Sequence, residues 1–317
     1  MSSYISETAL HPTIIEGFMW ARAKQGGIFR AFLPEELHTE GLTYNYTSYD
    51  DAQALPAKEA PPGTEATFSY GKPSRIPVTA KPFRVKDFID EWDKKWSVID
   101  SAREKTDMLT DKILRAHDYN LVQHLTNFKQ AAAGATLAFY GAGTYPYMAS
   151  KDKTGSGWDD ATDGAKFAIA DLLEAKKWIR KNAFLDADTL IINPDAEEAL
   201  LKQATIRETM YWGGEGPPVI IGGKLSKFMG LDIIVVSGKY QDEVETEYDL
   251  IDDRAIVCHR GRDGSDLGVN HVAEQLWSKV YDEPKLRATY IEVGKTFNHH
   301  IKRQKCVVDI IDVIAPS

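Results

Sequence analysis

Hydrophobic residues follow a helical period in two stretches of the chain. Between residues 98 and 133 the apolar positions form thin lines, with Leu109 and Ile113 on one and Leu121 and Leu125 on another. A long helix with so narrow an apolar stripe is expected to lie across a surface rather than inside a core. A second, clearly amphipathic helix is predicted after residue 163, and its apolar face comprises Ala165, Ala168, Ile169, Leu172, Leu173, Lys176 and Ile179.

A different pattern, with a period of two, flanks a proline-rich stretch. Tyr44 and Tyr46 on one side, and Phe68 and Tyr70 on the other, keep the alternation of β-strands. Six of the 14 prolines lie between Pro56 and Pro82, which bars such strands from the centre of a sheet. Residues 41–82 therefore predict a long two-stranded hairpin that needs another surface to lie on.

The middle of the chain alternates short apolar runs with helical and glycine-rich segments. The run 188–193 predicts a buried strand, after which Asn193 and Pro194 favour the start of a helix. Further strands are predicted at 231–237 and, at the end of the chain, at 307–314. Residues 1–40 carry only short apolar clusters. They fit either an arm that packs onto another surface or the first helix and strand of the main domain.

Composition narrows the class of protein. With 43% hydrophobic and 27% charged residues, the 317-residue chain can bury a core, and the mixture of elements predicts an α+β fold. A net charge of −9 argues against a dedicated DNA-binding domain. The apolar runs are too short to cross a bilayer, no signal peptide is evident, and the two cysteines fit a reducing compartment. We therefore expect no membrane partner.

The motifs that carry chemistry are missing. Gly223-Lys224 is followed by leucine where a phosphate-binding loop needs Ser or Thr, and Gly141-x-Gly143 lacks the third glycine of a dinucleotide site. His117 and His124 lie two helical turns apart, so packed or solvated histidines are the simpler interpretation than a metal site. The acids at 159–163 and 263–266 fit solvated turns. The sequence thus predicts no catalytic residue, no cofactor site and no metal site.

One charge cluster stands out. Residues 242–253 hold seven acids and no base. A solvated loop is the simplest interpretation, but a contact between assembled copies is also possible, with the basic run at Lys302 and Arg303 as a conceivable counterpart.

The order of these parts resembles the major capsid proteins of tailed double-stranded DNA bacteriophages, which share the HK97-like shell fold. The resemblance rests on the layout of nearly the whole chain and on two weak local motifs, the strand–Asn-Pro–helix segment at 188–200 and the Gly-Leu-x-Ile-Ile-Val strand at 230–235. It implies an N-terminal arm, an extended loop called the E-loop, a peripheral domain with a long spine helix and an axial domain. The implied boundaries are 1–40 for the arm, 41–82 for the E-loop, 83–150 with 271–304 for the peripheral domain (spine helix at about 98–133), and 151–270 with 305–317 for the axial domain.

The resemblance also implies a structural function without enzymatic activity. Copies would form hexamers and pentamers of an icosahedral shell in the virion, assembled in the host cytoplasm and enclosing DNA without sequence-specific binding. Neighbouring capsomers would meet through the E-loop and the arm, and a separate scaffolding protein and a portal would be further partners. The residues expected at contacts between subunits are Tyr44, Tyr46, Tyr49, Phe68, Tyr70, Asp242, Glu243, Glu245, Lys302 and Arg303. Three alternatives stay open: an encapsulin-type compartment shell, a soluble α+β enzyme with an unrecognised acid/base site, and another virion or tail component with a related α+β domain.

Overall fold

The structure is a computed structural model, and the chain forms two compact units in it. Unit 1 comprises residues 1–44, 77–121 and 270–299, and unit 2 comprises 45–76, 122–269 and 300–317. The described residues are 12–25, 32–38, 41–48, 74–90, 98–126, 147–149, 157–160, 162–203, 220–221, 224–241, 247–251, 253–283, 288–311 and 313–314.

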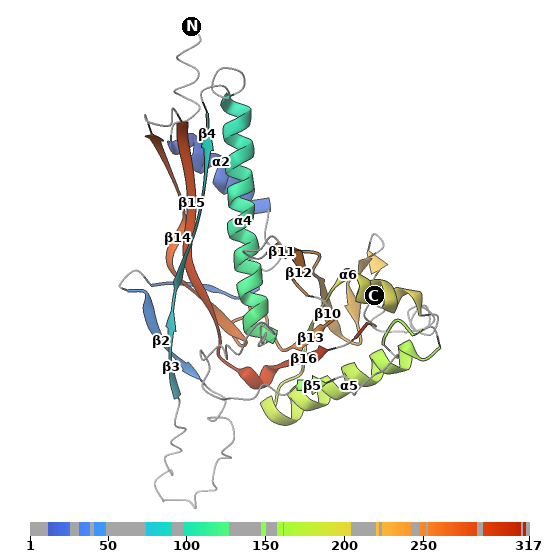
Figure 1. The fold of residues 1–317 in the computed structure, drawn as a ribbon. Helices are drawn as coiled ribbons and strands as arrows, with labels where there is room; N and C mark the ends of the chain where they lie inside the picture. The colour runs from blue at the N-terminus through green and yellow to red at the C-terminus, as the bar shows by residue number, and fades with distance from the viewer. Residues whose placement is uncertain are drawn as a thin grey trace, which may run out of the picture. The chain divides into compact units, whose positions relative to one another are not determined.

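Unit 1 is built on a four-stranded sheet in the order β1-β14-β15-β4. Its strands are β1 (Glu35–Leu37), β4 (Lys81–Ile89), β14 (Gly268–Glu283) and β15 (Ala288–Ile301). Two helices, α2 (Pro12–Gln25) and α4 (Val98–Thr126), lie along this sheet (Figure 1). The core between helices and sheet comprises Ile15, Met19, Ile89, Ala102, Leu109, Ile113, Ile291 and Val293.

The long helix predicted at 98–133 is confirmed over 98–126, and the remaining residues lie outside the described part of the chain. Leu109 and Ile113 face the core as expected, but the buried line also carries polar residues. The hydroxyls of Thr106, Thr110 and Thr126 each donate to the carbonyl oxygen four residues earlier, at 2.6 to 2.8 Å. These bonds let α4 bury a face that looks mostly polar in sequence.

For residues 1–40 the sequence left two interpretations open, an arm that packs onto another surface or the first helix and strand of the main domain. The structure shows a helix and a short strand there, since α2 contributes Ile15 and Met19 to the core, and β1 pairs in parallel with β14. The side chain of Arg22 also donates two hydrogen bonds to the carboxylate of Asp111 on α4, at 2.8 and 2.6 Å. These described parts of residues 1–40 therefore pack within their own unit.

Strands β2 (Thr43–Ser48) and β3 (Ser74–Thr79) form a two-stranded sheet of their own. The hydroxyls of Thr43 and Thr79 lie 2.9 Å apart across it. The ends of the predicted hairpin at 41–82 thus pair as expected, while the β-prone segment at 66–70 lies outside the described residues. Strand β3 contains Pro77, because both strands of such a sheet are edges where a proline is tolerated.

Unit 2 contains a mixed six-stranded sheet in the order β5-β16-β13-β6-β10-β9. The strands are β5 (Tyr147–Ala149), β6 (Thr189–Ile192), β9 (Lys227–Phe228), β10 (Leu231–Val235), β13 (Ala255–Cys258) and β16 (Val307–Ile311). Central strands β6 and β13 are buried at every position. The predicted strands at 188–193, 231–237 and 307–314 are thus confirmed. Two small sheets, β7 (Ile220–Ile221) with β8 (Lys224–Leu225) and β11 (Lys239–Gln241) with β12 (Glu247–Asp249), and the 3-10 turn η1 (Gln304–Cys306) complete the unit.

Two helices flank this sheet. In α6 (Pro194–Lys202) the Asn193 side chain accepts a hydrogen bond from the Ala196 amide at 2.7 Å, which confirms the predicted cap. Helix α5 (Gly164–Ala183) packs against α6, η1, β13 and β16. Its buried face includes Ala168, Leu172 and Ile179, but the prediction for Leu173 was wrong, since that side chain is 53% exposed. Consecutive helical residues point about 100° apart, so Leu172 and Leu173 cannot both face the sheet.

Candidate assembly surfaces

The predicted contact residues on β2 have very different surroundings. Tyr44 is 44% exposed and stacks on the ring of His38, with 3.8 Å between ring centroids. Tyr46, in unit 2, is only 4% exposed and stacks on His300 at 5.2 Å. Tyr44 therefore offers surface to a neighbouring molecule, whereas Tyr46 is already packed within its own chain.

Most of the other predicted contact residues cannot be placed. Tyr49, Phe68, Tyr70, Asp242, Glu243 and Glu245 lie outside the described residues. Lys302 and Arg303 are half-buried beside β15, and their backbone amides donate to the carbonyl oxygen of Leu267 at 2.9 and 3.3 Å. The sequence suggested this basic pair as the counterpart of the acidic run, and its backbone is anchored inside unit 2.

The buried histidines form part of the packing. His117 on α4 and His299 on β15 lie with their Nε2 atoms 3.2 Å apart, and Asn120 accepts from His299 Nδ1 at 2.7 Å. Burial lowers the pKa of His117 below its ordinary value, and burial lowers the pKa of His300 to about 4. The hydrogen-bonded imidazoles of His117 and His299 join a helix to a strand, and the ring of His300 stacks on Tyr46, so all three are structural groups. This agrees with the packed histidines expected from sequence.

The acidic turns also behave as the sequence predicts. The carboxylate of Asp160 accepts from the amides of Thr162 and Asp163 at 2.8 and 2.9 Å, and these bonds lower the pKa of Asp160. Asp263 accepts from the hydroxyl and the amide of Ser265 at 2.6 and 3.1 Å, which lowers its pKa in the same way. Across the described ranges, no group of three or more His, Cys, Asp or Glu side chains is arranged to hold a metal ion.

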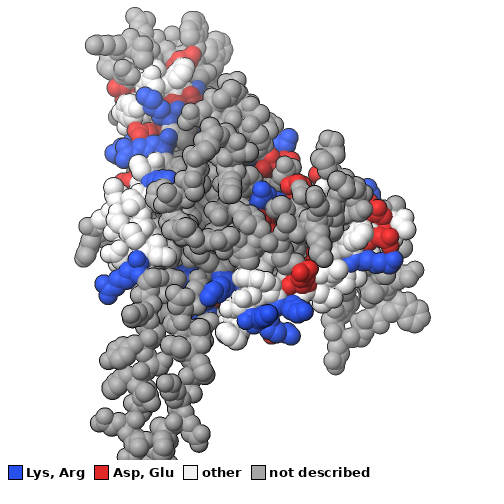
Figure 2. All heavy atoms as spheres, turned by 60° about the horizontal axis from the view of Figure 1, so that its bottom comes forward, with Lys and Arg blue, Asp and Glu red and all other residues white. Residues whose placement is uncertain are grey.

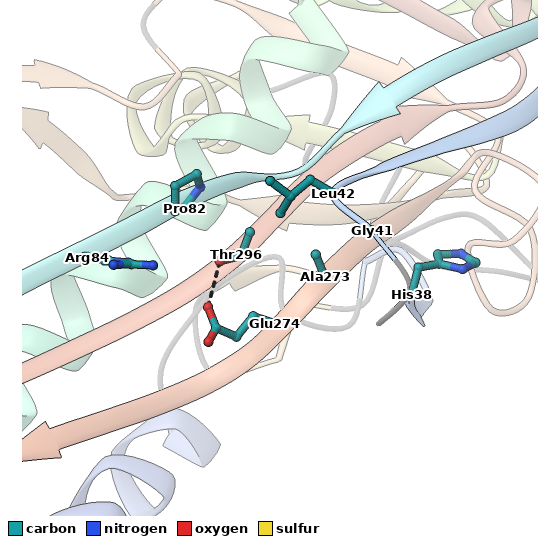
Figure 3. Close-up of a pocket in the computed structure, with 8 residues that line it drawn as sticks. All are labelled: His38, Gly41, Leu42, Pro82, Arg84, Ala273, Glu274 and Thr296. Carbon is teal, nitrogen blue, oxygen red and sulfur yellow. Dashed lines mark hydrogen bonds between the residues drawn. The ribbon is translucent and has the colours of Figure 1, made fainter.

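A pocket of about 430 Å³ in unit 1 has polar side chains in its lining that could in principle form a reactive site. Arg84, Glu274, Thr296 and His38 are among its lining residues. In Figure 3 the Glu274 carboxylate accepts from the Thr296 hydroxyl at 3.0 Å, while His38 points away from both. Among the described lining residues, the hydroxyl has the Glu274 carboxylate beside it but no further group that orients this carboxylate as a base, so the arrangement typical of an activated nucleophile is incomplete there.

A comparison with models of known protein families identifies the family of this chain. A family model described as phage capsid protein matches residues 51–291, which is more than half of the chain. This chain belongs to the phage capsid protein family. It is a structural protein of the capsid shell, and its location is therefore the virion. A comparison with curated protein sequences finds no match.

Solved structures agree with this capsid assignment at the level of the fold. A phage-related protein from Bordetella bronchiseptica is similar with a TM-score of 0.63 and 13% identity, over 94% of this chain and 97% of that one. The capsid of cyanophage P-SCSP1u is similar with a TM-score of 0.60 and 14% identity, over 90% of this chain and 88% of that one. A virus-like particle from Pyrococcus furiosus is similar with a TM-score of 0.56 and 12% identity, over 93% of this chain and 97% of that one. The capsid protein therefore has the α+β HK97-like fold that the layout of its sequence suggested.

Membership of the capsid family makes contact surfaces the functional features of this chain. A shell protein acts through surfaces that fit other copies, and such surfaces need shape, apolar anchors and complementary charge rather than a reactive group. The described helices of this capsid protein include none long and apolar enough to span a membrane.

Proposed function

We propose that this capsid protein self-assembles into hexamers and pentamers of an icosahedral shell that encloses double-stranded DNA. Residues 83–150 and 271–304 would form its peripheral domain, with α4 as the spine helix, and 151–270 with 305–317 its axial domain. Residues 41–82 would be the E-loop and 1–40 the arm. Assembly would take place in the host cytoplasm, with a separate scaffolding protein and a portal, and without an enzymatic step.

The observation that carries the proposal is the β2–β3 ribbon. It forms no part of the four-stranded or the six-stranded sheet, and the 25 residues between its strands, 49–73, are rich in proline and polar residues. Tyr46 and Val78 of the ribbon are buried within their own chain, but the exposed part of a two-stranded ribbon gains stability from a further surface that covers it. Exposed Tyr44 supplies an aromatic anchor of the kind that dominates protein interfaces. Both features favour a ribbon that lies on a neighbouring subunit.

The decisive measurement is the particle mass of the purified protein by light scattering, with negative-stain microscopy. Sixty copies of the 35.4 kDa chain make about 2.1 MDa, so a closed shell is unmistakable. Rings of five or six copies would support the same proposal. A monomer or dimer that persists after co-expression with the phage scaffolding protein and portal would overturn it.

A matched pair of variants tests the role of the ribbon. Tyr44 and Tyr281 are 44% and 40% exposed, and only Tyr44 lies on the ribbon. We expect Tyr44→Ala to reduce the yield of particles several-fold, and Tyr281→Ala to leave it within twofold of wild type. An equal effect of both substitutions would contradict a special role for Tyr44.

The nucleic acid content of the particles separates the virus from a compartment shell. A virion shell produced in infected cells should contain double-stranded DNA, seen as an absorbance ratio typical of nucleic acid and as nuclease-resistant DNA. Particles from infected cells that hold only protein would instead favour the encapsulin-type alternative.

A further inference from the structure

A chain of hydrogen-bonded polar side chains joins α4 to the sheet of unit 1. His117 on α4 and His299 on β15 are 5% and 1% exposed, and their Nε2 atoms lie 3.2 Å apart. Asn270 on β14 donates from Nδ2 to His117 Nε2 at 3.0 Å, and His299 Nδ1 lies 2.7 Å from the side-chain oxygen of Asn120 on α4. We call these four side chains the histidine network. It links the long helix to two neighbouring strands (Figure 1).

The direction of the hydrogen bonds at His117 follows from Glu35 on β1. The amide nitrogen of Asn270 also donates to the Glu35 carboxylate, at 3.2 Å, and an ionised carboxylate only accepts. The nitrogen of Asn270 therefore faces both groups, and His117 Nε2 accepts. The N–H of His117 is then on Nδ1, on the side of Asp118 at 3.7 Å. Burial lowers the pKa of His117, which agrees with a neutral ring.

His299 must then provide the proton of its contact with His117. Because His117 Nε2 is an acceptor, the 3.2 Å contact is a hydrogen bond only if His299 Nε2 donates; otherwise two lone pairs face each other. The Nδ1 atom of His299 faces the oxygen of Asn120, which also needs a donor. Both ring nitrogens of His299 are therefore donors, and two N–H groups are the inventory of a protonated imidazole.

The charges around the pair favour one additional proton. Asp118 on α4 and Glu35 on β1 attract a proton to the site, whereas Lys295 on β15 repels it. Lys295 also donates to the Glu35 carboxylate at 2.6 Å, which keeps that carboxylate ionised. The fourth neighbouring element, β14, contributes the uncharged Asn270. Two carboxylates against one ammonium balance one positive charge on the histidine pair but not two.

A cavity of about 140 Å³ brings solvent close to the histidine network. His117, Glu35 and Lys295 are among its lining residues. The side chain of Glu35 is 43% exposed, so the cavity lies next to bulk water although His117 itself is buried. A proton can therefore reach or leave the pair while unit 1 stays folded.

We propose that the His117–His299 pair binds one proton in the folded protein and forms a pH-sensitive joint between α4 and the sheet of unit 1. With the proton bound, His299 donates to Asn120 and to His117 at once. After the proton leaves, His299 keeps a single N–H, so the Asn120 amide has to turn or one of the two contacts becomes repulsive. The joint is therefore strong at low pH and weakens as the pH rises. This inference does not depend on the proposed function.

His300, the next residue along the chain, provides a contrast. Its ring stacks on Tyr46, and burial lowers its pKa to about 4. A buried histidine of this kind stabilises the fold only while it is neutral. Its contribution is present above about pH 6.5 and is lost as the pH falls towards 4. The histidine network predicts the opposite sign for His299, because there the folded state holds the proton more tightly than the unfolded state.

Urea unfolding of the unassembled full chain tests this sign. Glutamine keeps an amide donor at position 299 but cannot take up a proton. We expect the folding equilibrium constant of the wild type, divided by that of His299→Gln, to be at least about fivefold larger at pH 5.5 than at pH 8.5. The matched control is His300→Gln, for which the same ratio should be about tenfold smaller at pH 5.5.

A second measurement observes the proton in the wild-type protein. In NMR spectra of the chain labelled with ¹⁵N-histidine, one ring should lose its second N–H at a higher pH than a solvent-exposed histidine does. Asn120→Asp should raise this pH and Asn120→Leu should lower it, because a carboxylate only accepts and leucine offers no acceptor. A merely structural role of Asn120 would change stability without moving the titration in opposite directions.

Two results would overturn the pH-sensitive joint. One is a stability ratio for His299→Gln that is equal or smaller at pH 5.5, since it would show that His299 is neutral in the folded chain. The other is a spectrum in which every histidine ring has lost its second N–H by the pH at which an exposed histidine does. Neither result bears on the shell function, which the particle mass tests separately.

Discussion

Gly294 on β15 leaves the space that the indole of Trp277 occupies on the neighbouring strand. A Cβ atom at this position would lie 2.6 Å from Cζ2 of Trp277 and 3.2 Å from Cγ of Arg84, whose guanidinium lies over the same ring. We expect Gly294→Ala to lower the free energy of unfolding by about 1–3 kcal/mol in urea titrations, because the ring must shift.

Gly17 on α2 provides the control for Gly294. Nothing lies within 4 Å of a Cβ atom placed there. Gly17→Ala should therefore stabilise the protein by about 0.5–1 kcal/mol, through the better helix propensity of alanine. The same chemical change would then have opposite signs at two positions, and a loss of stability at both would contradict the steric argument.

Asp309 on β16 predicts a pH dependence. It is 5% exposed, and burial raises its pKa to about 6, although its carboxylate accepts from Arg254 at 2.7 Å. The folded state thus binds this proton more tightly than the unfolded state. The stabilising contribution is complete below about pH 4 and is lost as the pH rises through 6.

The variant Asp309→Asn isolates this contribution. The difference in unfolding free energy, variant minus wild type, should grow by about 2 kcal/mol between pH 4 and 7, because all other titrations cancel. Urea titrations of both proteins across this range provide the measurement. Parallel stability curves would show that Asp309 has an ordinary pKa.

For single residues, the sequence does not reveal which of two similar neighbours is buried. Leu172 and Leu173 look equivalent, and only the packing of α5 on the sheet decides that Leu172 is inside. Tyr46 and Tyr44 likewise share a strand and a pattern. The ring of His300, 254 positions further along the chain, covers one of them, and such a contact between distant residues has no local signal.

Among the elements, α2 shows how a short amphipathic segment is held. Met19 is fully buried against the core of unit 1, whereas Arg22 pairs with Asp111 at the surface, with side chains 39% and 27% exposed. Met19→Ala should cost about 2–4 kcal/mol, because it leaves a cavity in a packed core. Arg22→Ala should cost less than about 1 kcal/mol, since exposed ion pairs contribute little.

Thermal melting of the two variants checks whether Met19→Ala destabilises the protein more than Arg22→Ala does. An equal loss of stability would mean that the ion pair, and not the apolar face, holds α2 in place. Adding 1 M salt should change the stability difference for Arg22→Ala more than that for Met19→Ala, because salt screens charges and leaves apolar packing nearly intact.

Elements with a strong local signal were the predictable ones. The start of α4, the strand before Asn193 and the cap of α6 follow from periodicity, β-propensity and helix capping. The pairing of the two ends of residues 41–82 was predictable too, but the bounds of β3 were not, because they depend on where the returning chain meets β2. The polar residues buried by α4 were missed for a related reason, since threonine hydroxyls bond to their own helix.

The whole molecule carries a net charge of −9, and its exposed cations are spread over both units. On the face seen in Figure 2, basic and acidic groups are interspersed. DNA-binding proteins attract the phosphate backbone through their cations, and a shell of net negative charge repels it. We expect purified shells not to cosediment with linear double-stranded DNA at 150 mM salt.

Lowering the salt concentration makes this test discriminating, because weaker screening strengthens both attraction and repulsion. If the net negative charge governs, shells should stay free of DNA at low salt as well. Shells that retain DNA increasingly as the salt concentration falls would show that cations gather on an accessible face. In that case the wall would hold its contents by attraction as well as by closure.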